Sequence, residues 1–313
     1  MQELLKRYLD YLGAERGFSP YTVRNYTTDL LGPRSGEHPM GFFQYLQEKG
    51  VKSLKNVNRH ILREYIGYLM EQNLSRRSIS RKLSAVRSLY RYLLREGYIE
   101  ENPIKLTTSP RLEKRLPECL SQEELNRLLS APSADTAQGM RDRAILEIVY
   151  ASGMRINEIT SLNLGQINLQ TGEIKVLGKG SKERMVLIGE MAIISLKKYL
   201  ETGRPRLVSL KGDRNALFIN RFGKRLSARS IQNMLGRMAL KAGIDKHVYP
   251  HLLRHTFATH MLDGGADLRV VQELLGHSSL GTTQVYTHVT QAQARKVYLA
   301  AHPMAKKADS DAE

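Results

Sequence analysis

The sequence has 313 residues, more than one domain usually contains, so two domains are expected. Apolar residues make up 41% of the chain, which is typical of a globular protein and excludes a disordered one. No apolar run approaches the roughly 20 residues that a membrane-spanning helix needs. The single cysteine, Cys119, cannot form an internal disulfide. With no secretory signal at the first residues, these features predict a cytoplasmic protein.

Charge indicates the class of partner. Lysine and arginine number 48 and aspartate and glutamate 31, a net charge of +17 that favours a polyanion, above all nucleic acid. A charged surface without any partner is the alternative. A membrane surface is less favoured because the basic residues are spread along the whole chain rather than gathered in one amphipathic helix.

The first hundred residues predict a helical domain. Leucine and tyrosine recur at helical spacing from Leu4 to Leu12, and Ser19 before Pro20 predicts a helix start. Glycine and proline predict a loop over 32–41, and further helices are expected over 58–72 and 75–97. The last of these has an apolar face and a basic face, which either meets phosphates or is merely solvated. The basic face consists of Arg76, Arg77, Arg81, Lys82, Arg87, Arg91 and Arg95.

A proline-containing, charged stretch then indicates an interdomain linker, with a boundary near residue 112. Ser121 and Glu124 form a capping box that opens the second domain. Ile174 and Val176, then Met185 and Leu187, alternate on the two sides of a Gly-Lys-Gly-Ser turn and predict a β-hairpin. Helices are expected over 140–153, 155–164, 190–203, 227–242, 251–263, 268–275 and 284–300. The polar C-terminal residues are expected to be disordered.

Six residues of the second domain together suggest phosphoryl transfer. In chain order they are Arg155, Lys179, His251, Arg254, His277 and Tyr286. Singly, each is explained as well by a surface, capping or core role. Together, two guanidiniums can clamp phosphate oxygens, lysine or histidine can move protons, and the phenol can attack phosphorus.

Two other chemistries are poorly supported. His251 and His255 are four residues apart, as helical metal ligands are, but no glutamate follows His251 and Cys119 is distant in sequence. The sequence GKGSK lacks the spacing of a nucleotide-binding phosphate loop and lies between predicted strands. Neither a metal nor any other cofactor is therefore expected.

The motifs that carry these residues resemble those of the tyrosine recombinases of the phage integrase family, most closely the Xer branch. They are ASGMRINEIT, GKGSKER, HLLRHTFATHML and LLGHSSLGTTQVYTHV, and SPYTVRNYTTDL and ISRKLSAVRSLYRYL give a weaker match in the first domain. The resemblance implies a mainly α fold: a helical core-binding (SAM-like) domain over 1–107, a linker over 108–117, and a mostly helical catalytic domain with a small antiparallel sheet over 118–302. A disordered tail then covers 303–313. The loop over 32–41 looks longer than is usual in the family.

The resemblance also implies a role for each residue. Arg155 and Arg254 hold the scissile phosphate, and Tyr286 attacks it to give a 3′-phosphotyrosyl link and a free 5′-hydroxyl. Lys179 protonates the leaving oxygen, His251 assists proton transfer from the tyrosine, and His277 hydrogen-bonds the phosphate. Glu158 and His255 are interpreted as supporting residues.

The implied partners are duplex DNA at a specific site, held in a clamp of the two domains, and further recombinase subunits. These subunits form a homotetramer or a heterotetramer with a paralogue, in which residues of about 289–302 dock on a neighbour or pack on their own domain. A DNA translocase of the FtsK type is implied as an activator of Xer-type resolution of chromosome or plasmid dimers. The alternatives are a mobile-element or phage integrase, a type IB topoisomerase, and an architectural DNA-binding protein that does not cleave.

Overall fold

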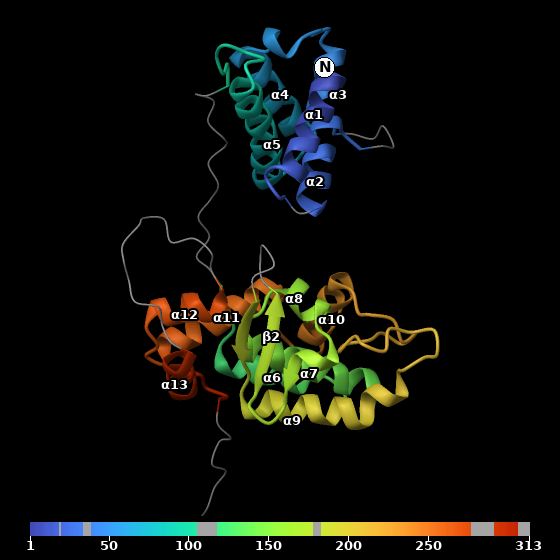
Figure 1. Ribbon diagram of the computed structural model, residues 1–313, viewed down its shortest axis with the longest axis vertical. Coiled ribbons are helices and arrows are strands. Elements are labelled where there is room, and N and C mark those ends of the chain that lie inside the picture. The colour runs from blue at the N-terminus through green and yellow to red at the C-terminus, as the bar shows by residue number, and fades with distance from the viewer. Residues whose placement is uncertain (19, 34–38, 105–117, 178–182, 277–290, 306–313) are drawn as a thin grey trace, which may run out of the picture. The chain divides into compact units, whose positions relative to one another are not determined.

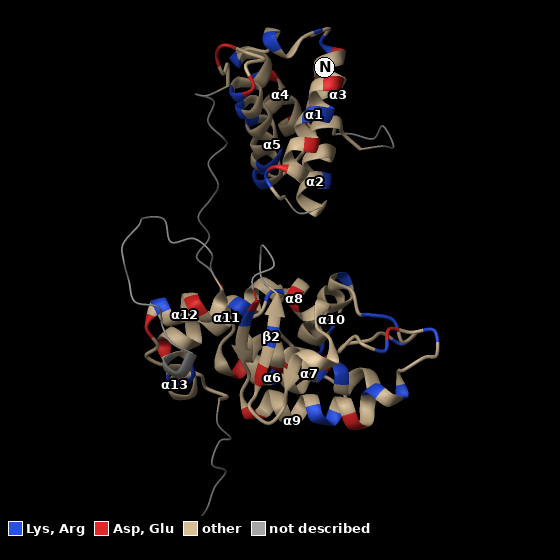
Figure 2. Ribbon diagram, viewed as in Figure 1, with Lys and Arg blue, Asp and Glu red and all other residues tan. Residues whose placement is uncertain are grey.

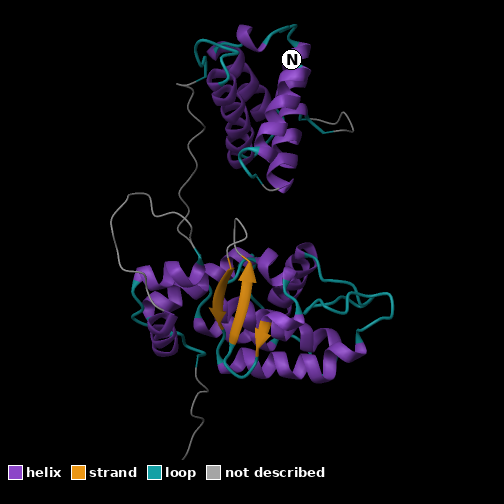
Figure 3. Ribbon diagram, viewed as in Figure 1, coloured by secondary structure: helices purple, strands orange, loops and turns teal. Residues whose placement is uncertain are grey.

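The computed structural model describes residues 1–313 except 19, 34–38, 105–117, 178–182, 277–290 and 306–313. The chain divides into two compact units, Met1–Arg115 and Leu116–Glu313, each with its own hydrophobic core (Figure 1). Both are mostly helical, and the strands lie in the C-terminal unit (Figure 3). The predicted mainly α fold with a small antiparallel sheet is confirmed. Among the described residues, no helix is both long and apolar enough to cross a membrane.

The N-terminal unit is a helical bundle. Its elements are α1 (Gln2–Ala14), α2 (Pro20–Leu31), α3 (Phe42–Glu48), the short 3-10 helix η1 (Leu54–Asn56), α4 (Arg59–Glu71) and α5 (Arg76–Arg95). Ser75 caps α5, because its hydroxyl accepts a hydrogen bond from the Ser78 N–H at 3.2 Å. Tyr8, Tyr65 and Tyr90 are fully buried in the core. The helices expected over 58–72 and 75–97 are confirmed to within two residues at each end.

One residue of the expected basic face of α5 lies in the core instead. Lys82 is only 5% exposed, and its ammonium is 3.6 Å from the carboxylate of Asp29, which is buried on α2. Arg81 also forms an ion pair with Asp29. A buried lysine needs a counter-charge, and the sequence of α5 alone does not reveal that α2 supplies one. The basic face of α5 is therefore narrower than predicted.

The C-terminal unit contains eight helices among its described residues. They are α6 (Gln122–Ser130), α7 (Ala137–Ser152), α8 (Ile156–Ser161), α9 (Glu190–Lys198), α10 (Ala228–Lys241), α11 (Pro250–Asp263), α12 (Leu268–Leu275) and α13 (Gln291–Ala301). Shorter turns of helix are η2 (Leu164–Gln166), η3 (Tyr199–Gly203), which has π geometry, and η4 (Arg204–Arg206). The capping box that opens α6 is confirmed, since Glu124 N–H donates to Ser121 at 3.2 Å and Ser121 N–H donates to Glu124 at 2.8 Å.

Helix α7 is the centre of this unit and is buried along almost its whole length. It packs against α9 and α11. Because a helix without an exposed face must still satisfy its polar residues, Arg141 pairs with Asp142 at 2.7 Å, and Glu147 pairs with Arg143 at 2.7 Å. Gly153 ends the helix in the left-handed conformation, with φ of 57°.

Among the described residues, three antiparallel strands form the sheet, in the order β1 (Ile167–Asn168), β2 (Glu173–Leu177) and β3 (Glu183–Leu187). The predicted hairpin corresponds to β2 and β3. Its register pairs Ile174 with Val186 and Val176 with Arg184. Residues directly opposite each other lie on the same face, so the inward positions of β3 are Arg184 and Val186 rather than Met185 and Leu187.

Helix α13 packs on the unit that carries it, against α11 and α12. Its Tyr298 is 2% exposed and Ala301 is 6% exposed. A helix was expected over 284–300, and residues 284–290 of that range lie outside the described part of the chain. In this single chain the described part of the segment packs on its own unit, and docking on a neighbouring subunit stays a prediction.

Candidate active site

Arg155 stands at the start of α8, directly after the turn that Gly153 makes at the end of α7. It is the N-cap residue of α8, and its backbone N–H donates to Glu158 Oε2 at 2.8 Å. Its guanidinium donates to Glu158 Oε1 at 3.2 Å, and the side chain is still 40% exposed. The arginine is thus held by its own helix while its side chain stays partly exposed.

Arg254 comes from the adjacent helix α11 and is 8% exposed. Its Nη1 donates to the Gly153 carbonyl at 2.6 Å and its Nη2 to the Leu275 carbonyl at 2.8 Å. Burial, followed by the positive charge of Arg155, lowers the pKa of Arg254 to about 10. Arg254 therefore remains charged at neutral pH, and an anion beside it would offset the cost of burying its charge next to Arg155.

The two arginines converge on the end of α12. Arg155 Nη2 donates to the Gly276 carbonyl at 3.3 Å, next in sequence to the Leu275 carbonyl that Arg254 contacts. Carbonyls at the C-terminal end of a helix carry partial negative charge and suit a guanidinium. The residue that follows Gly276 is His277, so the predicted histidine motif begins where both arginines are anchored.

A buried carboxylate links the arginine of α8 to the sheet. Glu158 is 7% exposed and accepts two hydrogen bonds from Arg184 of β3, at 2.8 Å and 2.9 Å. Burial alone would raise its pKa, but the hydrogen bonds from Arg184 and from the Arg155 backbone outweigh burial and lower the pKa of Glu158 below its ordinary value. Among the described groups here, three guanidiniums surround one carboxylate, which makes the site electropositive.

His251 lies on the first turn of α11, three residues before Arg254, and is exposed. Its exposure leaves the imidazole accessible to a substrate that the arginines hold. His255 is half-buried one turn further along the same helix. In the described parts of the chain, no cluster of three or more His, Cys, Asp or Glu side chains is arranged to hold a metal ion.

The structure brings together Arg155, Arg254 and Glu158 of the predicted residues. Lys179, His277 and Tyr286 lie outside the described residues, so their positions remain predictions. Arg184 was not singled out in the sequence, although it belongs to the motif GKGSKER. Its contact with Glu158 joins residues 26 positions apart, and no local spacing reveals such a pair.

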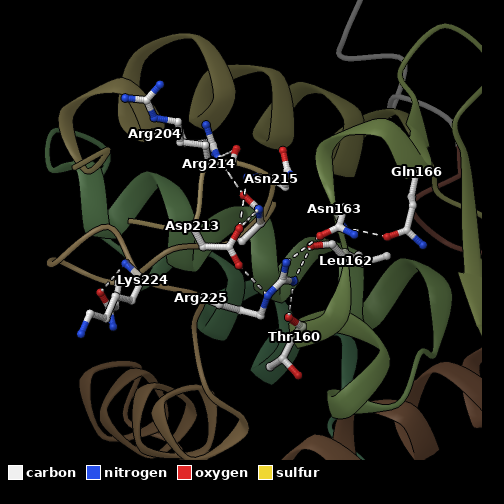
Figure 4. Close-up of polar contacts among 12 residues, drawn as sticks. Thr160, Leu162, Asn163, Gln166, Arg204, Asp213, Arg214, Asn215, Lys224 and Arg225 are labelled. Atoms are coloured by element: carbon white, nitrogen blue, oxygen red, sulfur yellow. Dashed lines mark hydrogen bonds and ion pairs between the residues drawn. The ribbon is translucent and has the colours of Figure 1, made fainter. Parts of the chain in front are cut away.

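Another arginine of the same unit, Arg225, joins the C-terminal end of α8 to the neighbouring loops. Arg225 donates to Asp213 at 3.0 Å, to the carbonyls of Thr160 and Leu162 at 3.0 Å each, and to Asn163 at 2.6 Å (Figure 4). These donors are directed at partners within the protein, as expected of a structural arginine.

Figure 2 shows lysine and arginine distributed over helices of both units rather than confined to one helix.

Comparison with known proteins agrees with this geometry. Residues 118–293 match the phage integrase family and residues 5–97 match the phage integrase N-terminal SAM-like domain. A relative named tyrosine recombinase XerC, from Pelotomaculum thermopropionicum, is 43% identical over 307 residues, which cover 96% of this chain and 98% of the relative. A tyrosine recombinase XerD from Staphylococcus epidermidis is 40% identical over 305 residues, 97% of this chain and 100% of the relative.

Among solved structures, the XerH site-specific recombinase bound to its difH substrate in a pre-cleavage complex is similar to this chain. The TM-score is 0.64 and the identity 26%, over 93% of this chain and 83% of that one. Sequence relatives and structural neighbour agree on the same class of enzyme. The chain therefore belongs to the phage integrase family and is a site-specific tyrosine recombinase of Xer type, which cuts and rejoins DNA by strand transfer.

Proposed function

We propose that Arg155 and Arg254 hold the scissile phosphate while the hydroxyl of Tyr286 attacks phosphorus. The Tyr286 oxygen–phosphorus bond forms, the bond from phosphorus to the 5′-oxygen breaks, and the strand end becomes a 3′-phosphotyrosyl ester. Lys179 gives a proton to the departing 5′-oxygen, His251 takes the proton of the phenol, and His277 hydrogen-bonds the phosphate. Rejoining is the reverse reaction with a 5′-hydroxyl of the exchanged strand. Because the ester conserves the energy of the broken bond, neither ATP nor a metal takes part.

One observation carries this proposal: guanidiniums from two different helices are anchored on consecutive carbonyls, Leu275 and Gly276, immediately before His277. Two fixed guanidiniums can donate to both nonbridging oxygens of a phosphodiester. They also stabilise the extra negative charge that builds up in the pentavalent transition state. The lowered pKa of Arg254 supports the same role, because burial and the positive charge of Arg155 disfavour this cation and a bound anion would stabilise it.

The two units are proposed to have different tasks. We propose that residues 1–107 bind DNA, residues 118–302 carry catalysis, and 108–117 connect them. The net charge of +17 supports phosphate contacts by both parts. The substrate is duplex DNA at a specific recombination site, by analogy with the XerH site-specific recombinase, which is bound to its difH substrate.

Assembly and biological role are inferred from the relatives. We propose that four subunits act on two paired sites and resolve chromosome or plasmid dimers in the cytoplasm, with a DNA translocase as activator. Relatives named XerC and XerD match this chain at similar identity, 43% and 40%. A homotetramer and a heterotetramer with a paralogue are therefore both compatible with these identities, and reconstitution from this chain alone distinguishes them.

The proposal is tested with a nicked suicide duplex, in which cleavage releases a short fragment and prevents rejoining. The recombination site is first recovered from a random pool of duplexes by its binding to this chain. Denaturing electrophoresis then shows a covalent protein–DNA band. We expect the band with the wild-type chain in the presence of a chelator and without ATP, and its loss with Tyr286→Phe at unchanged DNA affinity. A normal band from Tyr286→Phe would refute the nucleophile assignment.

A further inference from the structure

We propose that Arg184 is a positioning residue of the recombination reaction: it fixes Glu158, and through it Arg155, and it ties the hairpin that carries Lys179 to the segment that leads to His277. This inference rests on the proposed function, which gives Arg155, Lys179 and His277 their roles. No contact between Arg184 and DNA is invoked. Its effect is exerted entirely through the groups that it holds.

The first contact orients the carboxylate. Arg184 binds both oxygens of Glu158, at 2.8 Å and 2.9 Å, in the planar two-pronged geometry that only a guanidinium offers. The same two oxygens accept from the backbone and side chain of Arg155, at 2.8 Å and 3.2 Å. Without Arg184, the buried carboxylate would be free to rotate toward Arg155 alone or to take up a proton. Either change alters the orientation of the Arg155 guanidinium.

The second contact concerns the hairpin. Arg184 is the second residue of β3 and pairs with Val176 of β2, so it lies one residue from the end of the strand where the connection 178–182 joins. That connection contains Lys179 and lies outside the described residues. The pair of Arg184 with Glu158 crosslinks β3 to α8 next to this end of the hairpin. It therefore holds the base of the segment on which Lys179 is placed.

The third contact is with the end of α12. A Cβ atom on Gly276 would lie 2.9 Å from Nε and 3.0 Å from Cζ of Arg184, so the guanidinium packs directly against the backbone of this glycine. Gly276 also has φ of 66°, a conformation that a side chain would strain. Nε of Arg184 is buried and has no hydrogen-bond partner among the described atoms. Burying an N–H group without a partner is costly, so the other contacts of Arg184 must stabilise it in this position.

Arg184 thus belongs to one of the four motifs that carry the proposed catalytic residues and contacts two others, through Glu158 and Gly276. Its charge also lowers the pKa of Arg254 of the fourth motif, after burial and Arg155. A purely structural arginine would influence folding alone. A positioning arginine must influence the rate of strand cleavage in a folded, DNA-bound enzyme.

The experiment separates binding from chemistry by single-turnover cleavage of the nicked suicide duplex at saturating protein, with DNA affinity measured in parallel. We expect Arg184→Met to lower the cleavage rate constant about 100-fold, the size typical of a misplacement near 1 Å, with DNA affinity within about threefold. Arg184→Lys recovers only part of the rate, because an ammonium cannot hold both oxygens. The double variant Glu158→Gln/Arg184→Met cleaves no more slowly than the slower single variant, because both changes remove one shared interaction.

Arg225→Met is the matched control, since Arg225 also makes several hydrogen bonds in this unit, one of them to the Thr160 carbonyl of α8, but none to Glu158 (Figure 4). It is expected to lower thermal stability and leave the cleavage rate constant unchanged. The positioning role would be overturned if Arg184→Met cleaved at the wild-type rate or lost only DNA affinity. It would also be overturned if Arg225→Met lost as much of the cleavage rate as Arg184→Met. A wild-type chain without a Tyr286-dependent band would instead overturn the proposed function itself.

Discussion

We expect protonation of His302 to lower the stability of the C-terminal unit at acidic pH. It follows α13, is 4% exposed, and its ring lies 4.9 Å from that of Tyr150, 5.0 Å from Tyr298 and 5.6 Å from Phe257. Its Nδ1 accepts a hydrogen bond from the Met304 N–H at 3.1 Å, which a protonated ring would lose. Burial is the largest effect and lowers the pKa of His302 to about 4.

The sign and size of the effect follow from linkage. Above pH 6.5 His302 is neutral in both the folded and the unfolded chain and adds no pH dependence. As the pH falls below 6.5 the unfolded chain takes up a proton that the folded chain refuses, so stability is lost until the pH passes the folded pKa of about 4. Between pH 7 and pH 4 the loss amounts to about 3 kcal/mol, at roughly 1.36 kcal/mol per pH unit.

The assay compares the wild-type chain with His302→Asn, whose amide oxygen replaces the Nδ1 acceptor but does not titrate. Urea unfolding is followed at pH 4 to 7 by circular dichroism, and hydrogen exchange in α7 assigns the transition to the C-terminal unit. We expect His302→Asn to gain about 3 kcal/mol relative to the wild type between pH 7 and pH 4. His247→Asn, at an exposed histidine, is the control and should follow the wild type. A constant difference between wild type and His302→Asn at every pH would refute the reasoning.

Three further predictions test the site and the fold. Arg254→Ala should lower the cleavage rate constant about 100- to 1,000-fold in single-turnover assays, and an active variant would exclude the clamp role. Gly153→Ala should lower the free energy of unfolding by more than about 1 kcal/mol, because its Cβ would lie 2.6 Å from Phe257 at φ of 57°. Leu89→Ala, at a fully buried site, should cost the N-terminal unit about 2 to 5 kcal/mol in urea unfolding. It should leave hydrogen exchange in α7 unchanged, and faster exchange there would contradict independent cores.

Local signals in the sequence were sufficient for much of the fold. The capping box of Ser121 and Glu124 marks the start of α6, and the apolar spacing of α5 predicts each of its ends to within two residues. Such features depend on residues within one or two turns of each other. The two arginines of the site were also identified, because each belongs to a motif rather than standing alone.

Features that depend on distant contacts were not predicted. Lys82 was assigned to the basic face of α5, but it is buried and forms an ion pair with Asp29 of α2. Met185 was expected to alternate inward, whereas the pairing of β2 with β3 places Arg184 inward and leaves Met185 39% exposed. In both cases the decisive partner lies on another element, so a single segment's periodicity cannot reveal it. The contact between Arg184 and Glu158 is likewise evident from the structure and not from the sequence.

The central claim is that Tyr286 becomes joined to the 3′ end of a cut DNA strand. The most direct measurement is mass spectrometry of the covalent adduct formed on the suicide duplex, after digestion of both the DNA and the protein. We expect a single modified peptide that carries a 3′-phosphonucleotide on Tyr286. A nucleotide attached to any other residue, or attached through its 5′-phosphate, would contradict the account.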